Sequence, residues 1–134
     1  MATDAGPLIA IVDGRDPHHH ACVAAMARIQ RPLETVLPAF TEAMHILYRE
    51  SGWRGQEALW LLLQRDLVVA PLEDADLNRA RELMRQYRDV PMDFADATLV
   101  AIAERRDLRE IFTLDRRGFS TYRLHGRTPF TMLP

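Results

Sequence analysis

The chain has 134 residues, of which 48% are hydrophobic and 27% charged, and its formal net charge is −2. This composition is ordinary for a soluble globular protein, and the length predicts a single domain over residues 1–134. The only cysteine, Cys22, excludes an intrachain disulfide and indicates a reducing, cytoplasmic setting. The start of the chain lacks a signal-peptide pattern, and no apolar run approaches the roughly 20 residues of a membrane-spanning helix. We therefore expect a soluble cytoplasmic protein.

The basic residues are unusual in kind and in distribution. All 17 are arginine, which a codon bias of the genome explains most simply. Seven of them nevertheless fall between Arg105 and Pro134, where only three acidic residues offset them. A basic C-terminal quarter on an otherwise acidic chain hints at a phosphate-bearing partner.

The first apolar segment can be interpreted in two ways. Met1–Thr3 reads as a very short strand that ends at Asp4. Leu8–Val12 is a five-residue apolar run, which periodicity alone does not assign, and its composition favours a strand. Pro7 instead suits the first turn of a helix. Both alternatives stay open at this point.

Short strands and helices alternate along the remainder of the chain. Strands are expected at the apolar runs Leu33–Leu37, Leu67–Ala70 and Ile111–Leu114, with a last edge strand at Phe130–Leu133. Helices are expected over Pro17–Ile29, Pro38–Ser51, Trp53–Arg65, Glu73–Tyr87 and Pro91–Arg106, and a turn over Arg116–Phe119. This alternation predicts an α/β fold whose short central parallel sheet, of about four or five strands, is flanked by helices.

The helix expected over Pro91–Arg106 organises the chain. Its body is apolar on every side, which predicts burial. Asp93 and Asp96 are three residues apart and share a face of its first turn. They can act as helix caps, with Asp93 at the N-cap and Asp96 at N3. Alternatively, Asp96 points into a cleft where it meets other carboxylates around a cation.

Further acids fall close to the ends of the expected strands. Asp4 follows the first strand and Asp115 the fourth, while Glu42 lies one turn into the helix after the second strand. Asp96 lies one turn into the helix before the fourth. Ligands of open parallel sheets bind at the carboxyl ends of the strands, where these acids would meet and repel one another unless a cation neutralised them. Such oxygen ligands suit Mg²⁺ or Mn²⁺, and such sites catalyse phosphoryl chemistry.

Four motifs carry a family resemblance that extends over essentially the whole chain. They are Asp4-Ala5-Gly6-Pro7-Leu8, Thr41-Glu42, Asp93-Phe94-Ala95-Asp96-Ala97 and Thr113-Leu114-Asp115-Arg116. In this order and at these distances they resemble PIN-domain ribonucleases, with VapC-type toxin subunits of toxin–antitoxin pairs the nearest likeness. The terminal Phe-Thr-Met-Leu-Pro also resembles the last strand of that family.

The resemblance implies an activity and a set of partners. It implies a metal-dependent endoribonuclease that uses Mg²⁺ or Mn²⁺ and leaves a 5′-phosphate and a 3′-hydroxyl. The metal-holding acids would be Asp4, Glu42, Asp96 and Asp115, with Asp93 an accessory ligand or simply a cap, and with Thr113 a supporting hydroxyl. A homodimer is the family expectation, as is a cognate antitoxin that inserts a C-terminal segment into the acidic cleft.

Other residues invite functional interpretations from the sequence. Arg116 and Arg117 follow Asp115 and could contact RNA phosphates or form a solvated turn. His18–His20 are consecutive and cannot all face one point on a helix, so a solvated helix start is favoured over a zinc site. Trp53 and Trp60 are two helical turns apart, and ordinary core is the default expectation over a homodimer face or a groove for a partner helix.

Three rival functions are compatible with an acidic α/β domain. A PIN-like domain that binds RNA or protein without cleavage is disfavoured by the four intact acids. A phosphoacceptor signalling domain would want a lysine near its acidic pocket, and this chain has none. A standalone processing nuclease differs from a toxin in lacking a small adjacent reading frame that encodes an antitoxin.

Overall fold

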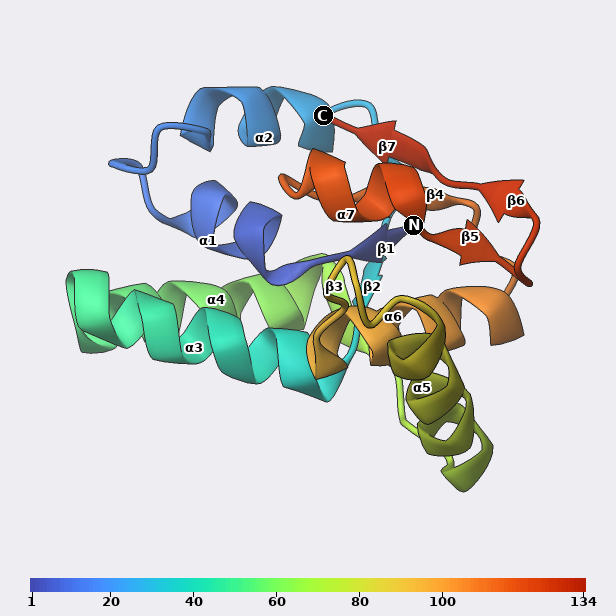
Figure 1. Cartoon of the computed structure of the whole chain (residues 1–134). Helices are drawn as coiled ribbons and strands as arrows, with labels where there is room; N and C mark the ends of the chain where they lie inside the picture. Colours follow the sequence, from blue (N-terminus) through green and yellow to red (C-terminus); the bar gives the residue numbers. More distant parts are fainter.

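A five-stranded parallel sheet lies at the centre of the computed structural model, which describes all residues from 1 to 134 (Figure 1). The strands run in the order β3-β2-β1-β4-β7, and every neighbouring pair is parallel. Their bounds are β1 Ala2–Thr3, β2 Leu33–Thr35, β3 Leu67–Val69, β4 Glu110–Phe112 and β7 Thr131–Leu133. The predicted α/β fold is confirmed, and its shortest strand, β1, lies in the middle of the sheet.

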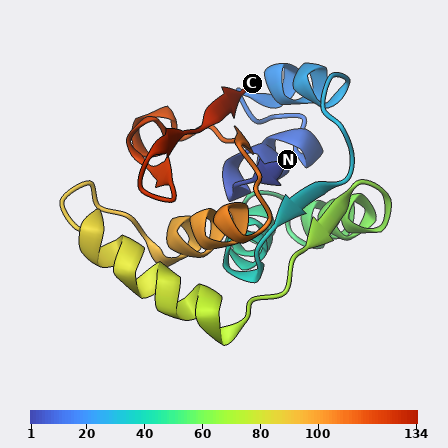
Figure 2. The ribbon, with the colours of Figure 1, turned by 90° about the vertical axis from the view of Figure 1, so that its right-hand side faces the viewer.

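Seven helices surround the sheet (Figures 1 and 2). They are α1 Ala5–Val12, α2 His19–Met26, α3 Leu37–Ser51, α4 Trp53–Arg65, α5 Asp74–Gln86, α6 Phe94–Arg105 and α7 Arg116–Thr121. α3 and α4 pack side by side, and α5 lies along the outer side of α6. None of the helices combines the length and apolar character that crossing a membrane requires.

Helix α6 is buried as its composition predicts. Every residue from Asp96 to Ala103 is buried, because the helix lies between the sheet and α5. Charged pairs join α5 to it: Arg79 binds Glu104 with both Nε and Nη2 (2.9 and 3.1 Å), and Arg105 Nε donates to Asp76 Oδ1 (3.0 Å). The amphipathic helix α5 thus covers the apolar helix α6, whose first turn carries Asp96.

The ambiguous run Leu8–Val12 is helical, so the strand alternative is wrong. Asp4 provides the N-cap of α1, and Pro7 falls within the first turn. Proline is tolerated there because the first backbone N–H groups of a helix have no intrahelical acceptor. β1 is consequently limited to two residues.

Two features near the C-terminus differ from the sequence expectation. The turn expected over Arg116–Phe119 is helix α7, which forms because the Asp115 side chain caps it. An additional antiparallel hairpin pairs β5, Arg123–Leu124, with β6, Thr128–Pro129. Its connection contains His125 and Gly126 at φ of 52° and 71°, the left-handed conformation used by tight turns.

The two tryptophans are on the surface, so the core expectation is wrong. Trp53 is 59% exposed and Trp60 is 46% exposed, because α4 turns Leu59 and Leu62 inward instead. Trp60 packs edge-to-face on Phe40 of α3, with 5.6 Å between ring centroids. The solvated helix start expected for the histidines is confirmed for His18 and His20, which are exposed, whereas His19 is half-buried and its Nδ1 lies 2.7 Å from the Ala10 carbonyl oxygen.

Candidate active site

Two of the predicted acids follow adjacent strands, and one threonine links them. Asp4 comes directly after β1, and Asp115 comes shortly after β4. Thr113 Oγ1 donates to Asp4 Oδ2 (3.1 Å) and accepts from the Asp115 backbone N–H (3.0 Å). The buried hydroxyl of Thr113 therefore orients the carboxylate of Asp4 and holds the backbone of Asp115 in place.

Three acids lie at the N-termini of three different helices and cap them. The pairs are Asp4 Oδ1 with Ala5 N at α1 (2.7 Å), Asp93 Oδ1 with Asp96 N at α6 (2.8 Å), and Asp115 Oδ1 with Gly118 N at α7 (3.0 Å). The N-terminus of a helix carries a partial positive charge that favours a carboxylate. Three helix dipoles therefore offset part of the negative charge at this edge of the sheet.

Capping leaves oxygen atoms available for a second role. Asp93 and Asp115 each use one carboxylate oxygen for the cap, and the other oxygen of each has no hydrogen-bond donor within the protein. Asp4 uses its second oxygen for Thr113. The capping and cation-binding interpretations of these acids are therefore compatible.

Asp96 is the buried member of the group. It is 9% exposed, and the only side-chain donor to its carboxylate is the Tyr122 hydroxyl, which reaches Oδ2 at 3.3 Å. Burial, followed by the negative charges of Asp4, Asp93 and Asp115, raises the pKa of Asp96 from 3.8 to about 8. In the absence of a cation this carboxyl group holds a proton near neutral pH.

Two more carboxyl groups belong to the same electrostatic group. Burial raises the pKa of Asp4, helped by the charges of Asp93 and Asp115 and opposed by its hydrogen bonds to Ala5 and Thr113. Glu42 lies on the second turn of α3, and although the residue is exposed, partial desolvation of its carboxyl group raises its pKa. The charges of Asp4 and Asp93 add to that rise. The five predicted acids thus form one connected electrostatic group, which Glu42 joins through Asp4 and Asp93.

The chemistry of this cluster fits a hard divalent cation. Carboxylate oxygens are the ligands that Mg²⁺ and Mn²⁺ prefer. A cation would offset the electrostatic cost of burying and clustering the carboxylates, which is what raises these pKa values. No three of the side chains already surround a point at metal-ligand distance. The group is therefore a set of clustered acids with free oxygens and not a finished coordination sphere.

The two predicted RNA-contacting arginines lie on the first turn of α7, immediately after Asp115. Both are exposed. Arg116 reaches the Pro134 carbonyl oxygen at 3.4 Å, whereas the Arg117 guanidinium has no hydrogen-bond or ion-pair partner in the protein. The positive charge of Arg117 is therefore available beside the acids.

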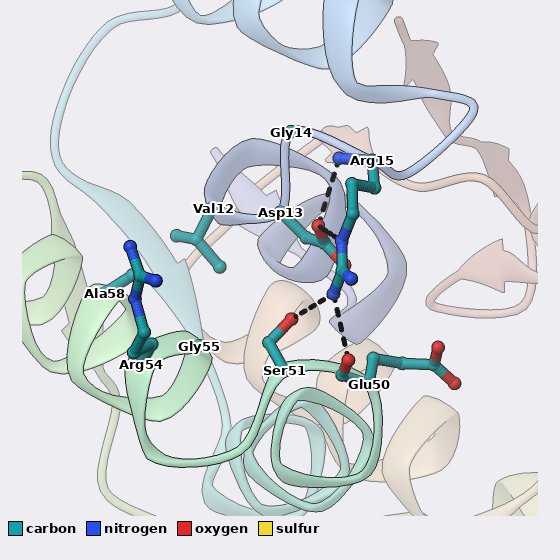
Figure 3. Close-up of a pocket in the computed structure, with 9 residues that line it drawn as sticks. All are labelled: Val12, Asp13, Gly14, Arg15, Glu50, Ser51, Arg54, Gly55 and Ala58. Carbon is teal, nitrogen blue, oxygen red and sulfur yellow. Dashed lines mark hydrogen bonds and ion pairs between the residues drawn. The ribbon is translucent and has the colours of Figure 1, made fainter.

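A surface cavity lies elsewhere, at the opposite end of α1 from Asp4 (Figure 3). It has a volume of about 730 Å³ and lies between the end of α1 and the corner that joins α3 to α4. Arg15 crosses it and donates to the Glu50 carbonyl oxygen (2.9 Å) and to Ser51 Oγ (2.8 Å). None of the five acids lines this cavity, so it is separate from the candidate site.

Tyr122 is the site residue that the sequence does not reveal. It stands 26 residues from Asp96 and ends α7, a helix that the sequence did not predict. No local spacing connects a tyrosine at a helix end with an acid on another helix. Only the packing of α7 against the site brings them together.

Comparison with known proteins supports one family. The family model described as PIN domain matches residues 1–123. Ribonuclease VapC26 of Mycobacterium tuberculosis is 28% identical over 139 residues, covering 100% of both chains.

Two solved structures share the fold. The structure of Mycobacterium tuberculosis VapC20, described as a sarcin–ricin loop cleaving toxin, superimposes with a TM-score of 0.80 at 16% identity and covers 90% of this chain and 95% of that one. A toxin–antitoxin complex from Klebsiella pneumoniae gives a TM-score of 0.71 at 18% identity and covers 90% of each chain. With the family match extending over most of its length, the chain belongs to the PIN-domain family.

Proposed function

We propose that this protein is a divalent-metal-dependent endoribonuclease that acts as the toxin of a VapC-type toxin–antitoxin pair. The observation that supports the proposal is the electrostatic coupling of five carboxyl groups from four parts of the fold. Such a cluster is costly unless it binds a cation. The full-length similarity to Ribonuclease VapC26 supports RNA as the substrate.

The acids divide into holding and accessory roles in this proposal. Asp4, Glu42, Asp96 and Asp115 hold Mg²⁺ or Mn²⁺. Asp93 is an accessory ligand through the carboxylate oxygen that does not cap α6. A divalent cation at such a site activates water and offsets the charge that develops on the phosphate. Thr113 keeps Asp4 oriented through its hydroxyl. The expected products carry a 5′-phosphate and a 3′-hydroxyl.

Arg116 and Arg117 are proposed to contact the RNA backbone. They project from α7, whose N-terminus begins at Asp115, so a phosphate bound there would lie next to the acids. Arginine contacts to phosphate contribute affinity and position the substrate without reading its sequence.

A cognate antitoxin and a second copy of the chain are the proposed protein partners. The fold similarity to a chain of a toxin–antitoxin complex motivates the first, and the family resemblance motivates the second. Trp53, Trp60 and Tyr48 are exposed on α3 and α4 and offer apolar area for one of these contacts. We propose that the protein acts in the cytoplasm.

The proposal is tested by measuring Mn²⁺ binding calorimetrically and RNA cleavage on the same samples. Wild type is compared with Asp96→Asn and with Asp107→Asn, a control that neutralises an exposed acid outside the cluster. We expect binding and cleavage to be lost in the first variant and kept in the second. Metal binding without cleavage of any RNA would favour a non-cleaving binding domain, and unchanged metal binding by Asp96→Asn would refute the proposed site.

A further inference from the structure

Tyr122 lies at the end of α7 with its hydroxyl directed at the acid cluster. The residue is buried, and the Asp96 carboxylate is the only acceptor for its hydroxyl, at an Oη–Oδ2 distance of 3.3 Å. A buried hydroxyl with a single acceptor is oriented by that acceptor and orients it in return. The contact joins α7 to α6 across the site.

The ring of Tyr122 is held in place by two other aromatic residues. Tyr87 and Phe119 both contact it edge-to-face, each with 5.1 Å between ring centroids. Phe119 in turn packs against Phe130 at 5.7 Å. Aromatic packing therefore fixes the position of the phenol, and Asp96 is positioned by a rigid donor.

Gly118 provides the space in which this contact forms. A Cβ atom at this position would lie 2.4 Å from Asp115 Oδ2 and 3.1 Å from Tyr122 Oη. The first distance is incompatible with any real side chain unless the Asp115 carboxylate moves. The carboxylate of Asp115 and the hydroxyl of Tyr122 thus both lie against the backbone of Gly118, and the phenol stands beside acids from two helices.

We propose that Tyr122 is a positioning residue that orients the Asp96 carboxylate for binding a divalent cation, and that Gly118 makes this arrangement possible. The inference rests on the proposed function and adds residues that none of the four acidic motifs contains. Hydrogen-bonded partners of metal ligands orient those ligands, and their loss typically weakens metal affinity or activity by 10- to 100-fold.

The test compares Tyr122→Phe with the matched control Tyr87→Phe. Both changes remove one phenolic hydroxyl from the same aromatic cluster, but the Tyr87 hydroxyl accepts from the Arg123 backbone N–H (3.1 Å) and contacts no acid. Binding of Mn²⁺ to each full-length protein is measured by calorimetry, and single-turnover RNA cleavage is measured alongside. For Tyr122→Phe we expect Mn²⁺ affinity about 10-fold weaker, with a lower cleavage rate and unchanged RNA affinity. Tyr87→Phe should keep the wild-type Mn²⁺ affinity.

A second variant protects the test against a folding defect. Gly118→Ala keeps the phenol and adds one methyl group, which would ordinarily favour a helix. Because that methyl group displaces the Asp115 carboxylate, we expect it to weaken Mn²⁺ binding as well. Wild-type Mn²⁺ affinity in Tyr122→Phe would overturn the role of Tyr122 whatever Gly118→Ala does, because Gly118→Ala acts through the Asp115 carboxylate, and it would leave the proposed function intact. A wild-type protein that binds no Mn²⁺ would overturn both.

Discussion

Replacing Asp96 with asparagine should stabilise the metal-free protein at neutral pH. The pKa of Asp96 is raised to about 8 in the folded protein, against an ordinary value of 3.8. The folded state therefore holds a proton that the unfolded chain releases. Because of this difference, the free energy of unfolding is highest below about pH 4 and falls as the pH rises toward 8. Asparagine resembles the protonated acid in shape and does not ionise, so the variant avoids this loss.

The size of the effect follows from the difference between the two pKa values. Each pH unit between them is worth about 1.4 kcal/mol, so at pH 7 the wild type loses on the order of 4 kcal/mol relative to acidic solution. For a domain of this size that corresponds to a melting temperature roughly 15 °C lower. Asp96→Asn should recover most of that difference at pH 7 and almost none of it at pH 4.

The assay is thermal and urea unfolding of wild type and Asp96→Asn in a chelator, repeated between pH 4 and pH 8. Saturating Mg²⁺ should then narrow the difference, because a ligand at 100 times its Kd stabilises the protein that binds it by about 2.7 kcal/mol, which offsets more than half of the loss of about 4 kcal/mol. The wild type should gain this stabilisation and the variant should not. A variant that is no more stable than wild type at pH 7 in chelator would refute the claim that burial and the neighbouring acids raise the pKa of Asp96.

Three further substitutions test other parts of the structure. Thr113→Val removes both hydrogen bonds of a buried hydroxyl and should lower the free energy of unfolding by about 2–3 kcal/mol in urea titrations, while a loss under 0.5 kcal/mol would contradict its bridging role. Arg116→Gln and Arg117→Gln should each lower the magnitude of the salt-dependence slope of RNA binding by about 0.7, measured by fluorescence anisotropy, and an unchanged slope would remove them from the RNA interface. Asp76→Ala breaks the buried pair with Arg105 and a helix cap and should cost about 2–4 kcal/mol, with Mn²⁺ affinity unchanged.

The sequence predicts the positions of the acids well because their placement follows local rules. Asp4 and Asp115 follow strands, and Asp93 precedes an apolar helix at the spacing of a cap. In each case the strand or helix end is encoded within a few residues of the acid. Parallel pairing of β1 and β4 then brings the separate segments together.

The features that the sequence did not predict depend on packing between distant segments. Tyr122 meets Asp96 only because α7 folds back over the site, and α7 is a helix of six residues with little periodic pattern. The spacing of Trp53 and Trp60 predicts that they share a face of α4, but spacing alone does not say whether that face is turned toward the core or toward solvent. Leu59 and Leu62 decide this by occupying the inner face.

The acids of the cluster differ in how the fold compensates their charge. Asp4, Asp93 and Asp115 each cap a helix, and caps of this kind contribute about 1 kcal/mol each, so part of their electrostatic cost is offset by the fold itself. Asp96 caps no helix, and the Tyr122 hydroxyl is the only side-chain donor to its carboxylate. A cation in the cluster would therefore offset the cost of burying Asp96, which a single hydroxyl donor compensates in the metal-free protein. The same imbalance makes the position of Asp96 sensitive to its only donor, which is why the hydroxyl of Tyr122 is expected to matter more for metal binding than for folding.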